Sequence, residues 1–366
     1  MNSGIPLDLA NERADIIDNL SYKIYFSVPS NRNEPILGEL TAIFNLARTG
    51  PVVFDFLEPS TNVRQVLLDG RPVAYETRNE HVIVPHVESG SVEIGFEFVA
   101  GNKSLNRHEE FLYTLFVPDR ARAAFPVFDQ PNLKAHYTLT LEVPETWRAV
   151  SNGPVTSRTT RNGRATVLFA ETRPISTYLF SFVVGKFDAV EQTRSGRRMV
   201  FYYREDDPDS LVRNVNEIFD LHASALSWLE DYTGINYPFD KFDFVAIPSF
   251  QYSGMEHPGA ILYRSDGLFM LETSTQNDFL RRASLIAHET AHQWFGDLVT
   301  MEWFDDVWMK ETFANFLAAK IVRPSFPNIN HNLRFLLAHY PSAYNVDRTD
   351  GANAIRQPLD NLNQAG

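Results

Sequence analysis

Two histidines four residues apart, with a glutamate between them and a second glutamate further along, restrict this chain more than any other feature. The segment His288-Glu289-Thr290-Ala291-His292 is predicted to be helical, so both imidazoles project from one face and can bind one Zn²⁺ at roughly 2.0–2.1 Å. Glu289 lies beside them and can take a proton from a water at the metal without being a ligand. A second helical stretch, residues 306–320, presents Glu311 as the predicted third ligand. We therefore expect one zinc ion per chain.

Two histidines on one helix face also occur by chance on ordinary polar surfaces. Here the neighbouring residues Leu285, Ile286, Trp294 and Phe295 are large and apolar, which predicts a buried helix. Burying histidine and glutamate without a metal or another partner would be costly. The local sequence therefore favours the zinc site over a chance pattern.

Composition restricts the partners and the ligand types. A net charge of −13 without a Lys/Arg cluster argues against nucleic acid and anionic membranes as partners. The absence of cysteine excludes thiolate ligands and disulfides, and leaves both the cytoplasm and an oxidising compartment open. No apolar run approaches the ~20 residues of a membrane span, and residues 1–20 hold no signal-peptide core. We expect a soluble protein, either cytoplasmic or exported to the periplasm with its signal removed.

The pattern of apolar residues divides the chain into two predicted domains. Residues 1–204 alternate between short strands and turns such as Asp69-Gly70 and Asn162-Gly163, which predicts an all-β domain of packed antiparallel sheets. Residues 205–366 hold a long helical stretch, two strands and then three helical stretches, which predicts an α+β domain. The last twenty or so residues are expected to form a surface loop.

Four segments resemble the M1 family of zinc aminopeptidases. Residues 287–303 (AHETAHQWFGDLVTMEW) and 308–314 (WMKETFA) resemble the family's zinc-binding segments. Residues 252–259 (YSGMEHPG) are similar to its Gly-x-Met-Glu-Asn exopeptidase motif, and residues 125–135 (FPVFDQPNLKA) to the signature of its β-domain. The resemblance implies an N-terminal β-sandwich or saddle domain followed by a thermolysin-like zinc-peptidase domain.

The resemblance also implies a role for each site residue. It identifies Glu289 as the general base and His288, His292 and Glu311 as the zinc ligands. Glu256 would hold the free amine of a peptide substrate, with Tyr252, Gly254 and Met255 around the first residue of that peptide. The implied activity is removal of N-terminal amino acids from peptides by a metal-activated water. Two alternatives stay open, a gluzincin endopeptidase and a peptide-binding zinc protein without turnover.

Three positions depart from the family pattern. His257 replaces the usual Asn, Ser253 replaces the usual Gly, and Val117 stands where many relatives carry a Glu or Gln that helps to hold the substrate amine. Glu109, Glu110 and Asp119 are candidates to take over that function. Asp305, Asp306 and Asn315 are candidates to support the metal ligands, whereas His222, His257, His331 and His339 lack ligand spacing.

The resemblance further implies a part beyond this sequence. Relatives stabilise the oxyanion with a tyrosine on a later helix and close the cleft with a large helical domain. Tyr340 and Tyr344 are the only tyrosines after Glu311, and neither lies in a matching context. We therefore expect a catalytic domain truncated at its C-terminus, a missing C-terminal helical domain, and a chain that binds zinc but hydrolyses peptides poorly.

Overall fold

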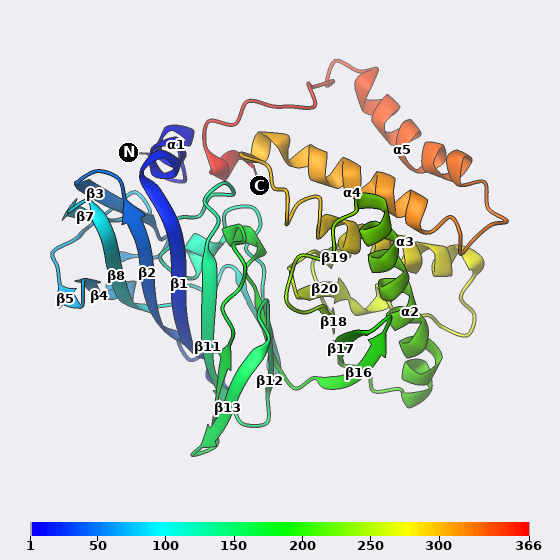
Figure 1. Ribbon diagram of the computed structural model, residues 1–366, viewed down its shortest axis with the longest axis horizontal. Helices are drawn as coiled ribbons and strands as arrows, with labels where there is room; N and C mark the ends of the chain where they lie inside the picture. Colours follow the sequence, from blue (N-terminus) through cyan, green and yellow to red (C-terminus); the bar gives the residue numbers. More distant parts are fainter. Residues whose placement is uncertain (1, 366) are drawn as a thin grey trace.

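Three β-sheets make up residues 17–185 of the computed structural model, which describes residues 2–365 (Figure 1). The largest sheet has eight strands, in the order β13 (Val155–Arg161), β14 (Arg164–Phe169), β11 (His136–Pro144), β1 (Ile17–Ser27), β2 (Leu37–Leu46), β8 (Gly90–Val99), β4 (Val63–Leu68) and β5 (Arg71–Pro72). A three-stranded sheet has the order β3 (Gly50–Asp55), β7 (His81–Val87), β6 (Glu76–Arg78). A four-stranded sheet has the order β12 (Arg148–Ser151), β15 (Phe182–Gly185), β10 (Phe111–Thr114), β9 (Leu105–Arg107).

The two small sheets pack against one face of the large sheet. Side chains along β1 alternate between buried and more exposed, as expected for a strand with one face in a core. Phe26 of β1 packs on Phe182 of β15 with ring centroids 5.3 Å apart, and Phe54 of β3 packs on Phe96 of β8 at 4.8 Å. The predicted β-domain of packed sheets is confirmed, although one of its strand pairs, β1 with β11, is parallel.

A buried ion pair fastens the N-terminal helix α1 (Leu7–Ile16) to these sheets. The guanidinium of Arg13 donates to both carboxylate oxygens of Asp55, at 2.7 and 2.6 Å, and His81 Nδ1 lies 3.0 Å from Asp55 Oδ1. Burial alone would raise the pKa of Asp55, but the charge of Arg13 and the hydrogen bond from His81 lower this pKa to about 2. The Asp55 carboxylate is therefore charged wherever the protein is folded near neutral pH.

Replacing Asp55 with alanine is expected to destabilise the β-rich half by about 3–5 kcal/mol at pH 7, because Arg13 would be left buried without its counter-ion. The depressed pKa means that this contribution is complete above pH 4 and is lost as the pH falls towards about 2. Denaturant unfolding followed by circular dichroism measures the change, with Asp350→Ala on the exposed surface as the control. Equal stability of the two variants would contradict the assignment.

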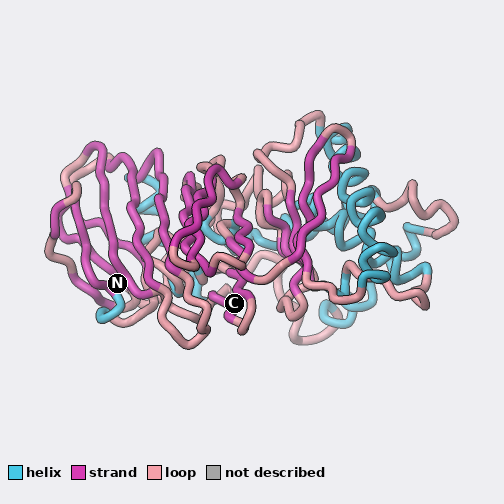
Figure 2. Tube along the Cα trace, turned by 90° about the horizontal axis from the view of Figure 1, so that it is seen from below, coloured by secondary structure: helices cyan, strands magenta, loops and turns pink. Residues whose placement is uncertain are grey.

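The remaining residues form a five-stranded sheet covered by helices. Its strand order is β16 (Asp188–Arg194), β17 (Arg197–Tyr203), β18 (Asp243–Ile247), β20 (Ala260–Arg264), β19 (Gly254–Met255). The helices are α2 (Pro208–Thr233), α3 (Gln276–His292), α4 (Val307–Ile321) and α5 (His331–Asp347). Figure 2 shows the helices gathered at the end of the molecule away from the large β-sheet. The predicted order of an all-β part followed by an α+β part is confirmed.

The hairpin β16–β17 belongs to this second sheet, although it lies within the range predicted for the first domain. Strand β17 pairs in parallel with β18, with Phe201 opposite Phe244. The predicted division between residues 204 and 205 would separate these two strands. We propose that the second unit begins at β16, near residue 188.

The end of the described chain is anchored to its beginning. Leu7 N donates to Asp360 O and Leu362 N to Ile5 O, while Trp303 Nε1 donates to Leu359 O at 2.7 Å. Leu359 and Leu362 are buried, so the expected surface loop is wrong at these two residues, whereas Asp360, Asn363 and Gln364 are exposed. Figure 1 shows this red segment returning to the side of α1. None of the helices in residues 2–365 combines the length and apolar character that crossing a membrane requires.

Candidate active site

Helix α3 carries both histidines of the predicted metal site on a buried framework. It begins with a capping box, in which Thr275 Oγ1 accepts from the backbone N–H of Asp278 and the Asp278 carboxylate accepts from the N–H of Thr275. Ile286 and Ala287 lie in the core, and His292 is the last helical residue. His288 and His292 therefore project from a helix whose position is fixed at both ends.

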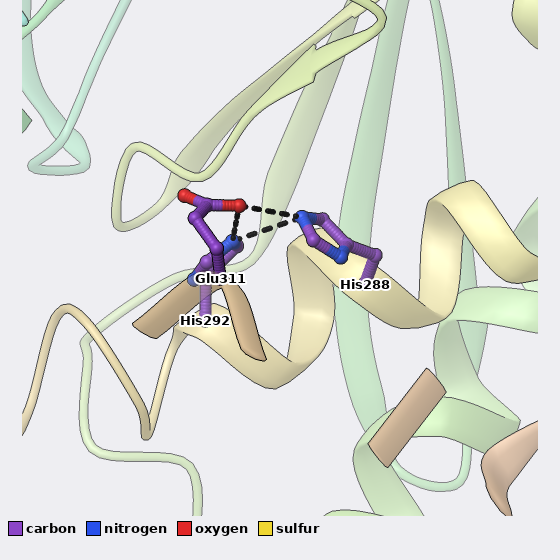
Figure 3. A group of neighbouring side chains, drawn as sticks. All are labelled: His288, His292 and Glu311. Carbon is purple, nitrogen blue, oxygen red and sulfur yellow. Dashed lines mark hydrogen bonds and ion pairs between the residues drawn. The ribbon is translucent and has the colours of Figure 1, made fainter. Parts of the chain in front are cut away.

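Glu311 of helix α4 completes a group of three side chains whose ligand atoms face one another (Figure 3). The Nε2 atoms of His288 and His292 are 3.0 Å apart. Glu311 Oε2 lies 3.4 Å from the first of these nitrogens and 3.6 Å from the second. The structure thus brings the three predicted ligands together from two helices.

The donor set and its spacing fit a zinc ion. Tetrahedral zinc with ligands at roughly 2.0–2.1 Å places neighbouring ligand atoms about 3.3–3.4 Å apart, close to the three separations observed. His292 Nδ1 lies 3.1 Å from the carbonyl oxygen of Phe295 and donates to it, which leaves the Nε2 lone pair directed at the group. The Glu311 side chain is 46% exposed, so solvent can reach an open fourth position. Burial would raise the pKa of Glu311, but the neighbouring His288 and His292 and the charge of Lys310 hold this pKa well below its usual range.

Glu289 lies next to the three predicted ligands, but its side chain is more buried than that of Glu311. Its side chain is buried, and burial raises its pKa to about 8. Strand β19 passes so close that a Cβ atom added at Gly254 would lie 2.3 Å from Glu289 Oε1. The absence of a side chain at Gly254 thus gives the Glu289 carboxylate its space.

Glu256 enters the site from the loop after β19, and three side chains hold that loop by its carbonyl groups. Gln293 Nε2 donates to Glu256 O at 2.8 Å, Asn152 Nδ2 donates to the carbonyl of Pro258 at 3.0 Å, and the Lys241 ammonium donates to the carbonyl of Gly259. Carboxylate oxygens of Glu256 and Glu289 and a ring nitrogen of His292 all lie within 4.8 Å of one another. The Glu256 carboxylate therefore lies beside the predicted base and a predicted metal ligand.

Comparison with known proteins gives a family for this arrangement. Residues 218–366 match the peptidase family M1 domain, and residues 73–179 match the peptidase M1 N-terminal domain. The chain belongs to peptidase family M1. This is a family of zinc metallopeptidases, so the family and the donor set agree on the metal.

Several aminopeptidases are similar to this M1 chain. "Probable aminopeptidase 1" of Sulfurisphaera tokodaii is 32% identical over 292 residues, which cover 78% of this chain and 37% of that protein. "Puromycin-sensitive aminopeptidase" of Caenorhabditis elegans is 38% identical over 272 residues, covering 72% and 28%. "Endoplasmic reticulum aminopeptidase 1" of Homo sapiens is 36% identical over 251 residues, covering 68% and 26%. The matched part thus spans about a quarter to two fifths of the length of these relatives.

Lys310 is a residue of this M1 site that the sequence reasoning missed. Its ammonium lies 2.6 Å from Glu256 Oε1 and 2.9 Å from Glu311 Oε1, and both Lys310 and Glu256 are buried. Burial would raise the pKa of Glu256, but the charge of Lys310 lowers it to about 2. The only signal in the sequence was a lysine directly before a predicted metal ligand.

The residues proposed to replace the missing amine contact at Val117 have other partners. Glu110 binds Lys186 at 2.7 Å and Arg204 at 2.6 Å, while Asp119 binds Arg122 at 3.0 Å. Glu109 is exposed. The contacts of Glu110 and Asp119 argue against their acting as additional amine contacts in this chain.

The other residues singled out in the sequence divide between the site and its surroundings. Met255 is buried in β19, and Tyr252 is 42% exposed with its ring edge-on to Phe250. Asp305 and Asp306 form ion pairs with Arg356. The supporting role predicted for them at a metal-binding histidine is taken, at His292, by the backbone carbonyl of Phe295.

Of the remaining residues, only Asn315 contacts a member of the metal cluster, and it does so through the backbone. Asn315 donates to the backbone carbonyl of Glu311 at 2.9 Å. His222 stacks on Phe244, and His331 lies 2.8 Å from the carbonyl of Phe326. His257 is fully buried beside Glu256, and burial lowers its pKa to about 4, so its ring is neutral at pH 7.

Proposed function

We propose that the protein is a zinc aminopeptidase that removes amino acids from the N-terminus of peptides, with zinc bound by His288, His292 and Glu311. The observation that carries the proposal is the short separation, within 4.8 Å, between ligand atoms of Glu256, Glu289 and His292. In a peptide, the α-nitrogen and the first carbonyl carbon are separated by only two bonds, roughly 2.5 Å. An ammonium held by Glu256 therefore presents the first peptide bond, and no later one, to Glu289 and the metal ligands.

The residues of the chain can divide the hydrolysis between them. Zinc at this position supplies a Lewis acid that lowers the pKa of a bound water towards ~7. A bound zinc would favour the ionised form of the nearby Glu289. Its carboxylate can then accept a proton from the attacking water and return it to the leaving amine. Its buried position on α3, directly beside Gly254 of β19, favours this transfer over exchange with bulk solvent.

Glu256 supplies the selectivity for a free N-terminus in this proposal. A buried carboxylate binds an ammonium through a charge-assisted hydrogen bond, which an internal peptide bond cannot offer. This is the feature that favours an aminopeptidase over an endopeptidase with the same metal ligands. Peptide substrates with a free N-terminus are accordingly the proposed partners.

Replacing Glu256 with glutamine is expected to lower kcat/KM for a free-amine peptide by about 10²–10³, since the substrate ammonium would lose its counter-ion in a buried place. An N-acetylated peptide, which has no such charge, should be affected much less. Steady-state assays with both peptides measure the difference, and Glu272→Gln on the surface is the matched control. An equal loss on both peptides would show that Glu256 has a purely structural role and would reopen the endopeptidase alternative.

A further inference from the structure

The Glu256 carboxylate already holds a cation when no substrate is bound. Lys310 Nζ lies 2.6 Å from Glu256 Oε1, and the side chains of the two residues are 8% and 4% exposed. The same ammonium lies 2.9 Å from Glu311 Oε1 and 5.7 Å from the centre of the Tyr178 ring. Two carboxylates and an aromatic face thus hold the Lys310 ammonium inside the site, next to Glu256.

No other basic side chain among residues 2–365 forms an ion pair with Glu256. Asp297 is also buried nearby, but burial raises its pKa well above the usual range, and among the described residues it forms no ion pair with Lys310. Lys310 is therefore the main positive charge that a ligand meets at the Glu256 carboxylate.

A substrate amine would have to share this carboxylate. Within residues 2–365 no donor forms a hydrogen bond with the second oxygen, Glu256 Oε2. An ammonium bound there would lie on the order of 5 Å from Lys310 Nζ, where two like charges repel strongly in a site with little water. Helix α4 and the three donors that hold the Glu256 loop leave the pair little freedom to separate.

We propose that Lys310 determines the amine selectivity of this site by competing with the substrate ammonium for Glu256. The inference rests on the proposed aminopeptidase function and adds a specificity-determining residue to it. Lys310 holds Glu256 Oε1 in place in the free protein, and its positive charge weakens the binding of a free amine relative to an uncharged N-terminus. A neutral side chain of similar length at this position should therefore strengthen the preference for a free amine.

The test is the binding of leucine amide and N-acetyl-leucine amide to the zinc-loaded full chain, measured by calorimetric titration in a Glu289→Gln background, in which hydrolysis is too slow to disturb the titration. In Lys310→Met, the ratio of the two dissociation constants is expected to shift about 10- to 100-fold in favour of the free amine. Lys310→Arg, which keeps the charge, should retain the wild-type ratio. An unchanged ratio in Lys310→Met, or a shift away from the free amine, would overturn the proposal and leave Lys310 a purely structural residue.

Three further variants serve as controls for this result. Lys310→Gln, which retains a hydrogen-bond donor, should show the same direction of change if Lys310→Met does not fold. In a Glu256→Gln background, Lys310→Met should no longer alter the ratio, because the shared carboxylate is gone. Lys320→Met, on the same helix with its ammonium over Phe316, is the matched control.

The outcome is independent of the proposed function. Release of free leucine from a leucyl peptide tests the aminopeptidase activity itself, whereas the ratio of the dissociation constants tests the role of Lys310. Hydrolysis with an unchanged ratio would reject the role of Lys310 alone. A shifted ratio without hydrolysis would support that role and reject the activity.

Discussion

Replacing Glu289 with glutamine is expected to lower the rate of peptide hydrolysis by at least about 10²–10⁴ while the protein keeps its zinc, because the change removes the proton acceptor but no metal ligand. Glutamine has nearly the same shape as glutamate and can occupy the buried position against Gly254. The measurements are the zinc content by elemental analysis and the initial rate on an amino-acid amide.

Glu302→Gln is the control for this variant, since Glu302 is exposed and lies outside the cluster. It should have the zinc content and the rate of the unaltered protein. Loss of zinc from Glu289→Gln would mean that Glu289 acts as a ligand, and an unaltered rate would remove it from the chemistry.

Loss of one predicted ligand is expected to abolish the stabilisation that zinc provides. A ligand present at 100–1,000 times its dissociation constant stabilises the folded state by about 2.7–4.1 kcal/mol. Zinc added to the metal-free protein should therefore raise the melting temperature of the helical half by several degrees, at roughly 2–4 °C per kcal/mol. His292→Ala should show little or no such rise, because one nitrogen of the cluster is missing.

The melting temperature is measured with and without zinc by differential scanning calorimetry. His339→Ala provides the matched control, because His339 lies on the exposed face of α5 beside Phe335 and has no part in the cluster. An equal rise with zinc in His292→Ala and His339→Ala would place the metal elsewhere.

The metal cluster could be predicted from the sequence because its geometry is mostly local. Residues four apart on a helix always share a face, so His288 and His292 needed only a correct prediction of α3. Glu311 required one more inference, that the next helix returns alongside the first. The alternation of apolar residues likewise predicted the β-rich half, since its strands bury one face.

Other features depend on contacts between residues far apart in the sequence, which local sequence patterns do not predict. The pairing of Lys310 with Glu256 joins residues far apart in the sequence, and a lysine on a helix is usually a surface residue. The hairpin β16–β17 alternates in the same way whichever sheet it joins, so the sequence alone could not show that β17 pairs with β18. The polar end of the chain resembled a loop because its anchor consists of hydrogen bonds to distant residues and only two buried side chains, Leu359 and Leu362.

The proposed aminopeptidase activity is tested most directly by identifying the products formed from one unmodified peptide and its N-acetylated form. The zinc-loaded protein is used in excess over peptide, so that a slow reaction is still detected by mass spectrometry. We predict the release of single amino acids from the free N-terminus, with the N-acetylated peptide left intact and no release by Glu289→Gln. Internal fragments appearing first, or equal cleavage of both peptides, would contradict the account.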